Sequence, residues 1–285
     1  MTHLWNTATV ESGGETIYYE VTGDADAPAI VLTHGAGGSH AAWFQQVPAL
    51  TDAGYRVITW DSRGFGKSTF STGVLGTEAS VADIGAVLDA VGIDRAHFVG
   101  QSMGGWWVTA FALAQPVRVR SITLSNTVGG LWTDALVEHF AGFVASTASA
   151  FGEQTRLGVH SALGPSLVTR DPARAFLYQQ LNTFHDPPMG AVAGALTGSA
   201  VEHSALDALG IPILVITGTD DALFPAPLVI DSASRLTNAT IVEIADAGHS
   251  PYFERPDEYN AVVLAFLAGR AGESAQNVSG LEETL

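Results

Sequence analysis

Short apolar runs recur along the chain, and most of them end at glycine or another turn-forming residue. They are too continuous for half-exposed strands and predict strands buried on both faces; they lie at 29–33, 55–60, 97–99, 121–124, 211–217 and 240–244. Ahead of them, residues 7–11 and 16–22 flank Ser12-Gly13-Gly14-Glu15 and predict a β-hairpin.

Apolar residues at helical spacing separate these runs. They predict helices over 43–53, 80–91, 103–114, 226–236 and 256–267. Strands that alternate with helices are typical of a parallel sheet covered on both faces, so we predict an α/β fold.

The alternation stops between residues 129 and 208, where the sequence is Ala-rich, helix-like and interrupted by Gly and Pro. We interpret this segment as a helical lid inserted into an α/β core made of residues 1–128 and 209–268. Residues 269–285 lack periodicity, and we expect a disordered tail.

Composition narrows the classes of partner and site. The formal net charge of −17 disfavours nucleic acid and anionic membranes as partners, so we expect a small-molecule substrate; the oligomeric state stays open. The chain has no cysteine, which excludes disulfides, thiolate nucleophiles and Cys-based zinc sites. Because it also lacks an 18-residue apolar run and a basic-then-apolar start, we expect a cytoplasmic protein.

Gly100-Gln101-Ser102-Met103-Gly104-Gly105 lies between a predicted strand and a predicted helix. A serine at so sharp a turn needs small neighbours, and the turn presents its hydroxyl at the carboxyl edge of the sheet. We therefore predict that Ser102 is a nucleophile. The alternative, a tight turn with an incidental serine, is the weaker interpretation in this context.

A serine hydroxyl needs a base, and an imidazole base needs a carboxylate that orients it. Of nine histidines, His249 follows the last predicted strand at a glycine-marked turn, and we predict it as the base. Asp220 and Asp221 both follow the preceding strand, and spacing alone does not choose between them. No histidine has metal-ligand spacing, so we expect no metal and no cofactor.

Acyl transfer also requires backbone N–H donors for the developing oxyanion. The amide of Met103, directly after the nucleophile, is one candidate. The second is the amide of Ala36 in the loop His34-Gly35-Ala36-Gly37-Gly38. This Gly-rich loop lacks the endings and spacings of phosphate-binding loops, which disfavours that alternative.

These motifs occur together in one known family. HGAGG at 34–38, DSRGFGKS at 61–68, GQSMGG at 100–105, GTDDALFP at 218–225 and AGHSPYFERP at 247–256 stand in this order. The chain resembles the lidded, cofactor-free branch of the α/β-hydrolases, which includes esterases, lactonases and carbon–carbon hydrolases. The resemblance implies a mostly parallel eight-stranded sheet flanked by helices, and a triad whose acid is Asp221.

The resemblance implies a serine hydrolase that cleaves a small or medium ester or lactone through an acyl-enzyme. A carbon–carbon hydrolase or an acyltransferase would use the same triad, and a non-catalytic ligand-binding homologue is the remote alternative. Ser250 stands where hydrolases of aromatic ring-cleavage products typically have tryptophan, which counts against the carbon–carbon interpretation. Trp106, on the helix behind Ser102, is a candidate substrate contact.

Overall fold

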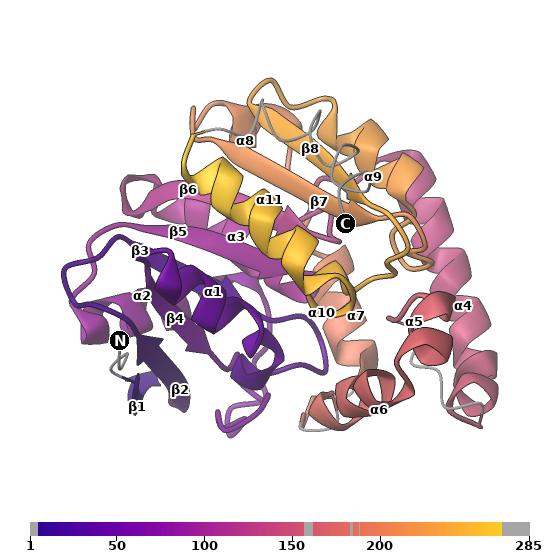
Figure 1. The fold of residues 1–285 in the computed structure, drawn as a ribbon, viewed down its shortest axis with the longest axis horizontal. Coiled ribbons are helices and arrows are strands. Elements are labelled where there is room, and N and C mark those ends of the chain that lie inside the picture. Colours follow the sequence, from indigo (N-terminus) through magenta and orange to yellow (C-terminus); the bar gives the residue numbers. More distant parts are fainter. Residues whose placement is uncertain (1–4, 157–161, 183–184, 188, 270–285) are drawn as a thin grey trace, which may run out of the picture.

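One eight-stranded sheet organises the molecule (Figure 1). The computed structural model describes residues 5–156, 162–182, 185–187 and 189–269, with side chains throughout these ranges except at 147–156. The strand order is β1-β2-β4-β3-β5-β6-β7-β8, with β1 and β2 antiparallel to their neighbours and all other pairs parallel. The predicted sheet is confirmed. Its strands are β1 (Trp5–Ser12), β2 (Glu15–Thr22), β3 (Ala29–Thr33), β4 (Arg56–Trp60), β5 (Ala96–Gln101), β6 (Val119–Ser125), β7 (Ile213–Gly218) and β8 (Ala239–Ile244).

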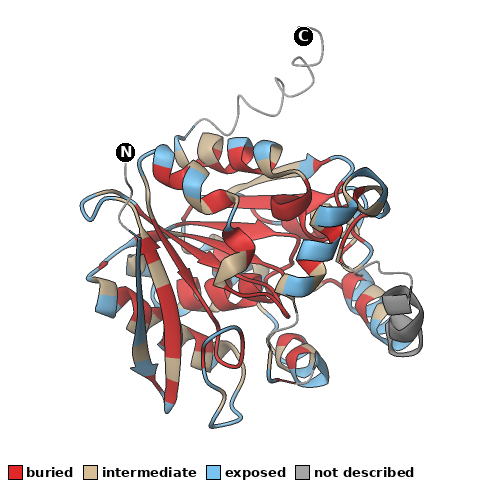
Figure 2. Ribbon diagram, turned by 60° about the horizontal axis from the view of Figure 1, so that its bottom comes forward, coloured by how far each residue is buried: buried red, intermediate tan, exposed pale blue. Residues whose placement is uncertain are grey.

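The central strands are apolar throughout because both faces are covered. In β3, Ala29 and Val31 belong to one buried cluster and Ile30 and Leu32 to the other, as alternating side chains of a strand require. Figure 2 shows these buried strands between partly exposed helices. Helices α2 (Thr77–Val91), α3 (Met103–Ala114) and α9 (Ala226–Ala233) contribute to the first cluster, and α1 (Gln46–Asp52) and α11 (Pro256–Leu267) to the second.

Several element ends differ from the predicted ones by a few residues. The helix predicted over 43–53 is divided into a 3-10 turn, η1 (His40–Trp43), and α1. The strand predicted over 211–217 corresponds to β7, which begins two residues later and ends one residue later. Pro212, which has no N–H to donate, lies just outside it. Short elements also occur at η2 (Pro116–Arg118) and α10 (Pro251–Glu254).

Between β6 and β7 the described residues form five helices, and we call residues 129–208 the cap. They are α4 (Asp134–Arg156), α5 (Pro165–Arg170), α6 (Pro172–Leu181), α7 (Met189–Thr197) and α8 (His203–Asp207). The cap lies against loops at the carboxyl edge of the sheet: the His139 ring contacts the Ala222 carbonyl oxygen at 3.0 Å, and the Asp186 amide donates to Gly64 O at 2.8 Å.

Two expectations concern the ends and the surface of the chain. All but the first residue of the expected tail lies outside the described residues. Across the described part of the chain, no helix has both the length and the hydropathy needed to cross a membrane.

Candidate active site

Ser102 occupies a strained turn between β5 and α3. Its backbone angles are φ 49° and ψ −120°, a conformation that costs on the order of 1–3 kcal/mol for a residue with a side chain. Its glycine neighbours allow the turn. A Cβ on Gly100 would lie 2.5 Å from the Gly104 carbonyl oxygen, and one on Gly104 would overlap the carbonyl of Thr33. The turn therefore holds the Ser102 side chain at the carboxyl edge of the sheet.

The predicted oxyanion donor Met103 is the first residue of α3. Amides in the first turn of a helix have no acceptor within the helix, and they carry the positive end of the helix dipole. Ser102 itself is 8% exposed, and in a site with so little water these amides would interact strongly with negative charge.

His249 and Asp221 form a buried pair. Nδ1 of His249 lies 2.8 Å from Oδ2 of Asp221, and both residues are less than 5% exposed. The Asp221 carboxylate is held from its other side, because the amides of Leu223 and Phe224 donate to Oδ1 at 2.9 and 3.0 Å. Nε2 of His249 is buried and has no hydrogen-bond partner within the described part of the chain.

The structure distinguishes Asp220 from Asp221, the two aspartates that spacing alone left as candidates for the carboxylate beside His249. Asp220 is exposed, and its side chain accepts a hydrogen bond from the hydroxyl of Thr219 at 3.2 Å. Its backbone amide donates to Ala247 O at 2.9 Å, which ties β7 to the loop that carries His249. Asp221 is the aspartate that contacts His249.

Asn126 is part of this site, and sequence reasoning missed it. It follows β6 in a left-handed conformation (φ 47°) and is fully buried. Its Nδ2 donates to Asp221 Oδ2 at 2.9 Å and to Gly248 O at 3.1 Å. Asparagine is one of the few residues that adopt this conformation readily, so an Asn directly after a buried strand was the available signal.

Side chains and close contacts join the loops that carry these residues. Gln101 Nε2 donates to the backbone oxygen of His249 at 3.1 Å, which links the Ser102 turn to the histidine loop, residues 247–250. A Cβ on Gly35 would lie 3.0 Å from Cβ of Ser102, so the Gly-rich loop passes close beside the serine. The structure thus brings the predicted site segments together at one edge of the sheet.

The Gly-rich loop that carries Ala36 forms a tight turn. Gly38 N donates to Gly35 O at 3.0 Å, and Gly37 has φ 82°. His34 anchors the start of the turn: its Nε2 accepts from the amide of Ser62 at 3.0 Å, so Nδ1 carries the hydrogen and donates to Gly35 O at 2.7 Å. Burial lowers the pKa of His34, which agrees with a neutral ring.

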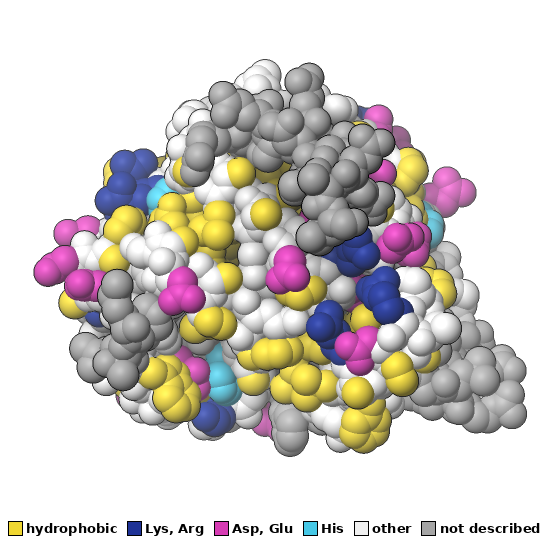
Figure 3. Space-filling view, viewed as in Figure 1, with side chains coloured by type: hydrophobic (Ala, Val, Ile, Leu, Met, Phe, Trp, Pro, Cys, Tyr) yellow, Lys and Arg dark blue, Asp and Glu magenta, His cyan; other side chains and the backbone are white. Residues whose placement is uncertain are grey.

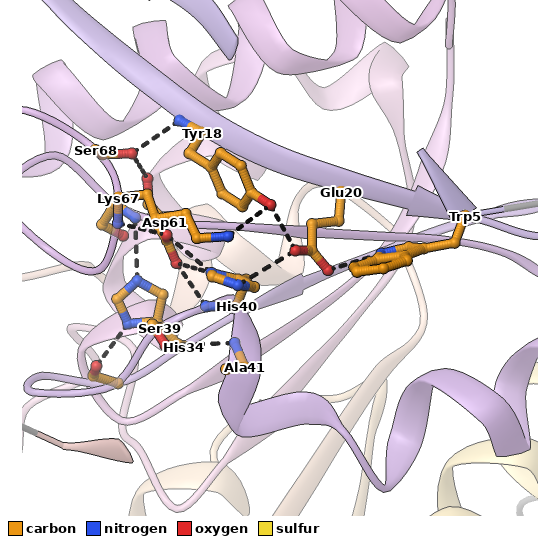
Figure 4. Close-up of polar contacts among 12 residues, drawn as sticks. Trp5, Tyr18, Glu20, His34, Ser39, His40, Ala41, Asp61, Lys67 and Ser68 are labelled. Atoms are coloured by element: carbon orange, nitrogen blue, oxygen red, sulfur yellow. Dashed lines mark hydrogen bonds and ion pairs between the residues drawn. The ribbon is translucent and has the colours of Figure 1, made fainter. Parts of the chain in front are cut away.

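His40 anchors the other end of this loop (Figure 4). Its backbone amide and its Nδ1 both contact Asp61 Oδ1, at 2.6 and 2.8 Å, and its Nε2 lies 3.3 Å from Glu20. Burial acts to raise the pKa of Asp61, but the hydrogen bonds and charge of His40 outweigh it and hold the pKa below its usual value. Asp61 therefore anchors the loop that carries Ala36.

Trp106 belongs to an aromatic cluster beside His249. Its ring centroid lies 5.6 Å from that of Trp132 and 5.9 Å from that of Phe224. Phe140 stacks on Phe224 at 5.7 Å, and Phe224 also lies 5.7 Å from the His249 ring. Trp106 is 1% exposed, so in this structure it is a wall residue one ring away from His249.

An apolar cavity of about 600 Å³ lies on the outer side of this cluster, between α4 and α7. Trp132 and Phe140 form the wall that it shares with the cluster. Among the described residues that line it, none is charged; they include Val137, Val144, Ala193 and Thr197.

The partly buried His97 has a structural environment. His97 Nδ1 lies 2.8 Å from Ser121 Oγ, and burial, with smaller contributions from Arg120 and Arg95, lowers its pKa to about 4. Within the described ranges, no group of three or more His, Asp or Glu side chains is arranged to hold a metal ion.

Comparisons with known proteins identify the family of the chain. The sequence model of the alpha/beta hydrolase fold family matches residues 28–256. The chain belongs to the α/β-hydrolase family. It is 30% identical over 283 residues to the 2-hydroxy-6-oxononadienedioate/2-hydroxy-6-oxononatrienedioate hydrolase of Paraburkholderia phymatum, covering 90% of this chain and 93% of the relative.

Two further similarities extend the comparison. The 3-oxoadipate enol-lactonase 1 of Acinetobacter baylyi is 29% identical over 267 residues, covering 89% of this chain and 94% of the relative. The solved structure of a thermophilic esterase from Thermogutta terrifontis superposes with a TM-score of 0.77 at 24% identity, covering 93% of this chain and 99% of the esterase, and shows the shared fold. Family membership and these relatives support a hydrolase.

Proposed function

We propose that this α/β-hydrolase cleaves a neutral carboxylic ester or lactone through an acyl-enzyme on Ser102. One observation carries the proposal. The His249 imidazole is fixed through Nδ1 to Asp221, while its Nε2 is buried and unpartnered among the described residues. A base in this tautomer has its lone pair available for the proton of a serine hydroxyl.

The proposed reaction has two halves. The oxygen of Ser102 attacks the substrate carbonyl carbon while Nε2 of His249 takes the hydroxyl proton, and Asp221 stabilises the resulting imidazolium. The tetrahedral oxyanion is held by the amides of Met103 and Ala36. The imidazolium then gives its proton to the leaving alkoxide, and the C–O bond of the ester breaks to leave the acyl-enzyme. In the second half, His249 takes a proton from water and the hydroxide attacks the acyl carbon. The bond from the acyl carbon to the Ser102 oxygen then breaks, the imidazolium returns its proton to that oxygen, and the acid is released.

The surroundings favour an apolar, uncharged substrate. Trp106 and Phe224 are the aromatic walls beside His249, and the cavity beyond them lacks charged lining residues in the part of the chain that the structure describes. The net charge of −17 disfavours the approach of polyanions. The similarity to a lactonase supports an ester or lactone, and the similarity to a hydrolase of an oxo-dienedioate keeps carbon–carbon cleavage by the same triad as the alternative.

The test is hydrolysis of p-nitrophenyl esters from acetate to decanoate, and of γ- and δ-lactones, by the wild type, Ser102→Ala and Ser234→Ala. Ser234 is an exposed serine after α9 and serves as the matched control. We expect turnover by the wild type and the control, and a loss of at least a thousandfold in Ser102→Ala. Equal activity in the wild type and Ser102→Ala would refute the assignment of Ser102 as the nucleophile. Turnover of β-diketones by a wild type that leaves esters and lactones intact would favour the carbon–carbon alternative.

A further inference from the structure

Glu254 is a buried carboxylate that the proposed reaction does not use. It ends α10, five positions after His249, and is 2% exposed. Its Oε1 accepts from the amide of Gly248 at 3.0 Å, and its Oε2 accepts from the amide of Gly164 at 2.9 Å. Gly248 lies in the histidine loop, whereas Gly164 lies in the cap at the start of α5. One carboxylate therefore holds two segments that are distant in sequence.

Further contacts join the cap to the same loop. Tyr178 of α6 and Ser250 of the histidine loop are both buried, and their hydroxyls lie 2.7 Å apart. Arg170 of α5 donates to the backbone oxygen of Glu254 at 3.3 Å. Basic side chains gather on this face where the ends of α5 and α10 meet (Figure 3).

The backbones themselves are in close approach at this contact. A Cβ on Gly164 would lie 2.9 Å from the amide nitrogen of Gly248 and 3.0 Å from Oε2 of Glu254. Only glycine at this position lets the cap reach the histidine loop. The contact therefore consists of close backbone packing as well as hydrogen bonds. A displacement of the cap at Gly164 would change the position of Gly248, the residue before His249.

We propose that Glu254 is a positioning residue, whose ionised carboxylate couples the cap to the histidine loop and holds His249 in its catalytic place. The inference rests on the proposed function, because it concerns the base of that reaction. Glu254 acts through Gly248 and is not itself a catalytic residue.

The charge environment makes this coupling sensitive to pH. The groups that interact electrostatically with Glu254 from the cap are Arg170 of α5 and Tyr178 of α6. The titratable group of the histidine loop, His249, is turned toward Asp221 instead. Burial raises the pKa of Glu254 to about 7, against the lowering effect of the backbone amides that donate to it. Protonation leaves one good acceptor oxygen and places a hydroxyl opposite the other amide, so one of the two bonds is weakened.

The first test compares kcat/KM for p-nitrophenyl butyrate between the wild type, Glu254→Gln and Glu258→Gln from pH 5.5 to 8.5. Glutamine retains the shape and one acceptor, and so imitates the protonated acid at every pH. We expect the wild type to exceed Glu254→Gln about tenfold at pH 8.5, and the ratio to approach one below pH 6. Glu258, which pairs with Arg255, is the matched control. We expect the ratio of kcat/KM between the wild type and Glu258→Gln to stay near one at every pH.

A merely structural role would give a ratio between wild type and Glu254→Gln that does not change with pH. That result, or a ratio of one at all pH values, would overturn the proposal. Thermal unfolding of each variant at pH 8.5 checks that the compared enzymes are folded.

The second test perturbs the same contact from the cap. Gly164→Ala leaves Glu254 intact but inserts a Cβ between the cap and the histidine loop. We expect it to lower kcat/KM, and the double variant with Glu254→Gln to be no slower than the slower single variant, because both break one coupling. Multiplicative losses in the double variant would show independent effects and would overturn the inference.

Labelling of Ser102 by a fluorophosphonate separates this inference from the proposed function. A wild type that is labelled but does not hydrolyse esters would refute the ester substrate, and labelling rates would then replace kcat/KM in both tests. Equal labelling rates for wild type and Glu254→Gln at pH 8.5 would overturn only the coupling. A wild type that is neither labelled nor active would refute the proposed function, and the inference with it.

Discussion

Replacing the carboxylate of Asp221 by an amide tests the proposed triad most directly. Oδ2 of Asp221 accepts from His249 Nδ1 and from Asn126 Nδ2, while Oδ1 accepts from the amides of Leu223 and Phe224. In Asp221→Asn, the oxygen is retained on the side of the two backbone amides. The new NH2 group then faces two donors, and the His249 ring must change its tautomer to accept from it.

The magnitude follows from that rearrangement. With the hydrogen on Nε2, His249 cannot take the proton of Ser102, and no carboxylate stabilises the imidazolium. The hydrogen bond from Asn126 to the charged carboxylate is also lost, and such a bond is worth about 1.5–3 kcal/mol. In a serine–histidine–aspartate triad the wrong tautomer lowers kcat by about 10⁴-fold. We expect a loss of about 10³–10⁴ in kcat/KM, equivalent to about 4–5.5 kcal/mol of transition-state stabilisation.

The assay is ester hydrolysis at pH 8 by the wild type, Asp221→Asn and Asp220→Asn. Asp220 is the matched control, since it is the adjacent aspartate and its exposed side chain accepts from the Thr219 hydroxyl. We expect Asp220→Asn to stay within about threefold of the wild type. A loss below tenfold in Asp221→Asn, in a protein whose thermal unfolding is unchanged, would refute the role given to Asp221. A large loss in Asp220→Asn instead would show that the other aspartate is the acid.

Three further predictions follow from the same contacts. Asn126→Gly keeps the left-handed backbone but removes a donor to Asp221, so we expect kcat/KM for esters to fall about tenfold; unchanged kinetics would contradict this. Gly104→Ala places a Cβ against a carbonyl of β3 and should lower the free energy of unfolding in urea by about 1–3 kcal/mol. Gly142→Ala on α4, whose added Cβ meets open space, should leave the free energy of unfolding unchanged. Equal losses of unfolding free energy in the two variants would refute the packing argument. Because the pKa of Glu254 rises from 4.5 to about 7 on folding, the folded state binds its proton more tightly, and the free energy of unfolding should fall as pH rises through this window. The difference in the free energy of unfolding between wild type and Glu254→Gln should therefore change by at most about 3 kcal/mol between pH 4.5 and 7.5. Curves of unfolding free energy against pH that run parallel for the two proteins would rule out the raised pKa.

Local features of the chain determined the architecture. The continuous apolar run at 29–33 predicted a strand buried on both faces, and the structure divides its side chains between two clusters. The turn at Ser102 was predictable because its requirement is local: glycines within two residues of a strained serine. Helix and strand ends were less predictable, because caps and prolines move them by a few residues.

Contacts between distant segments were decided only by the tertiary structure. Asp220 and Asp221 are adjacent in the chain, and what distinguishes them is which one lies under His249, 28 residues beyond Asp221. Asn126 and Glu254 carry no motif of their own, because their roles depend on the loop of another strand and on the cap. Periodicity and turn chemistry act within a few residues, whereas hydrogen bonds among buried loops depend on how the whole sheet and the cap pack. The sequence by itself therefore determined the fold and the kinds of residue at the site, and the packed structure decided which of them touch.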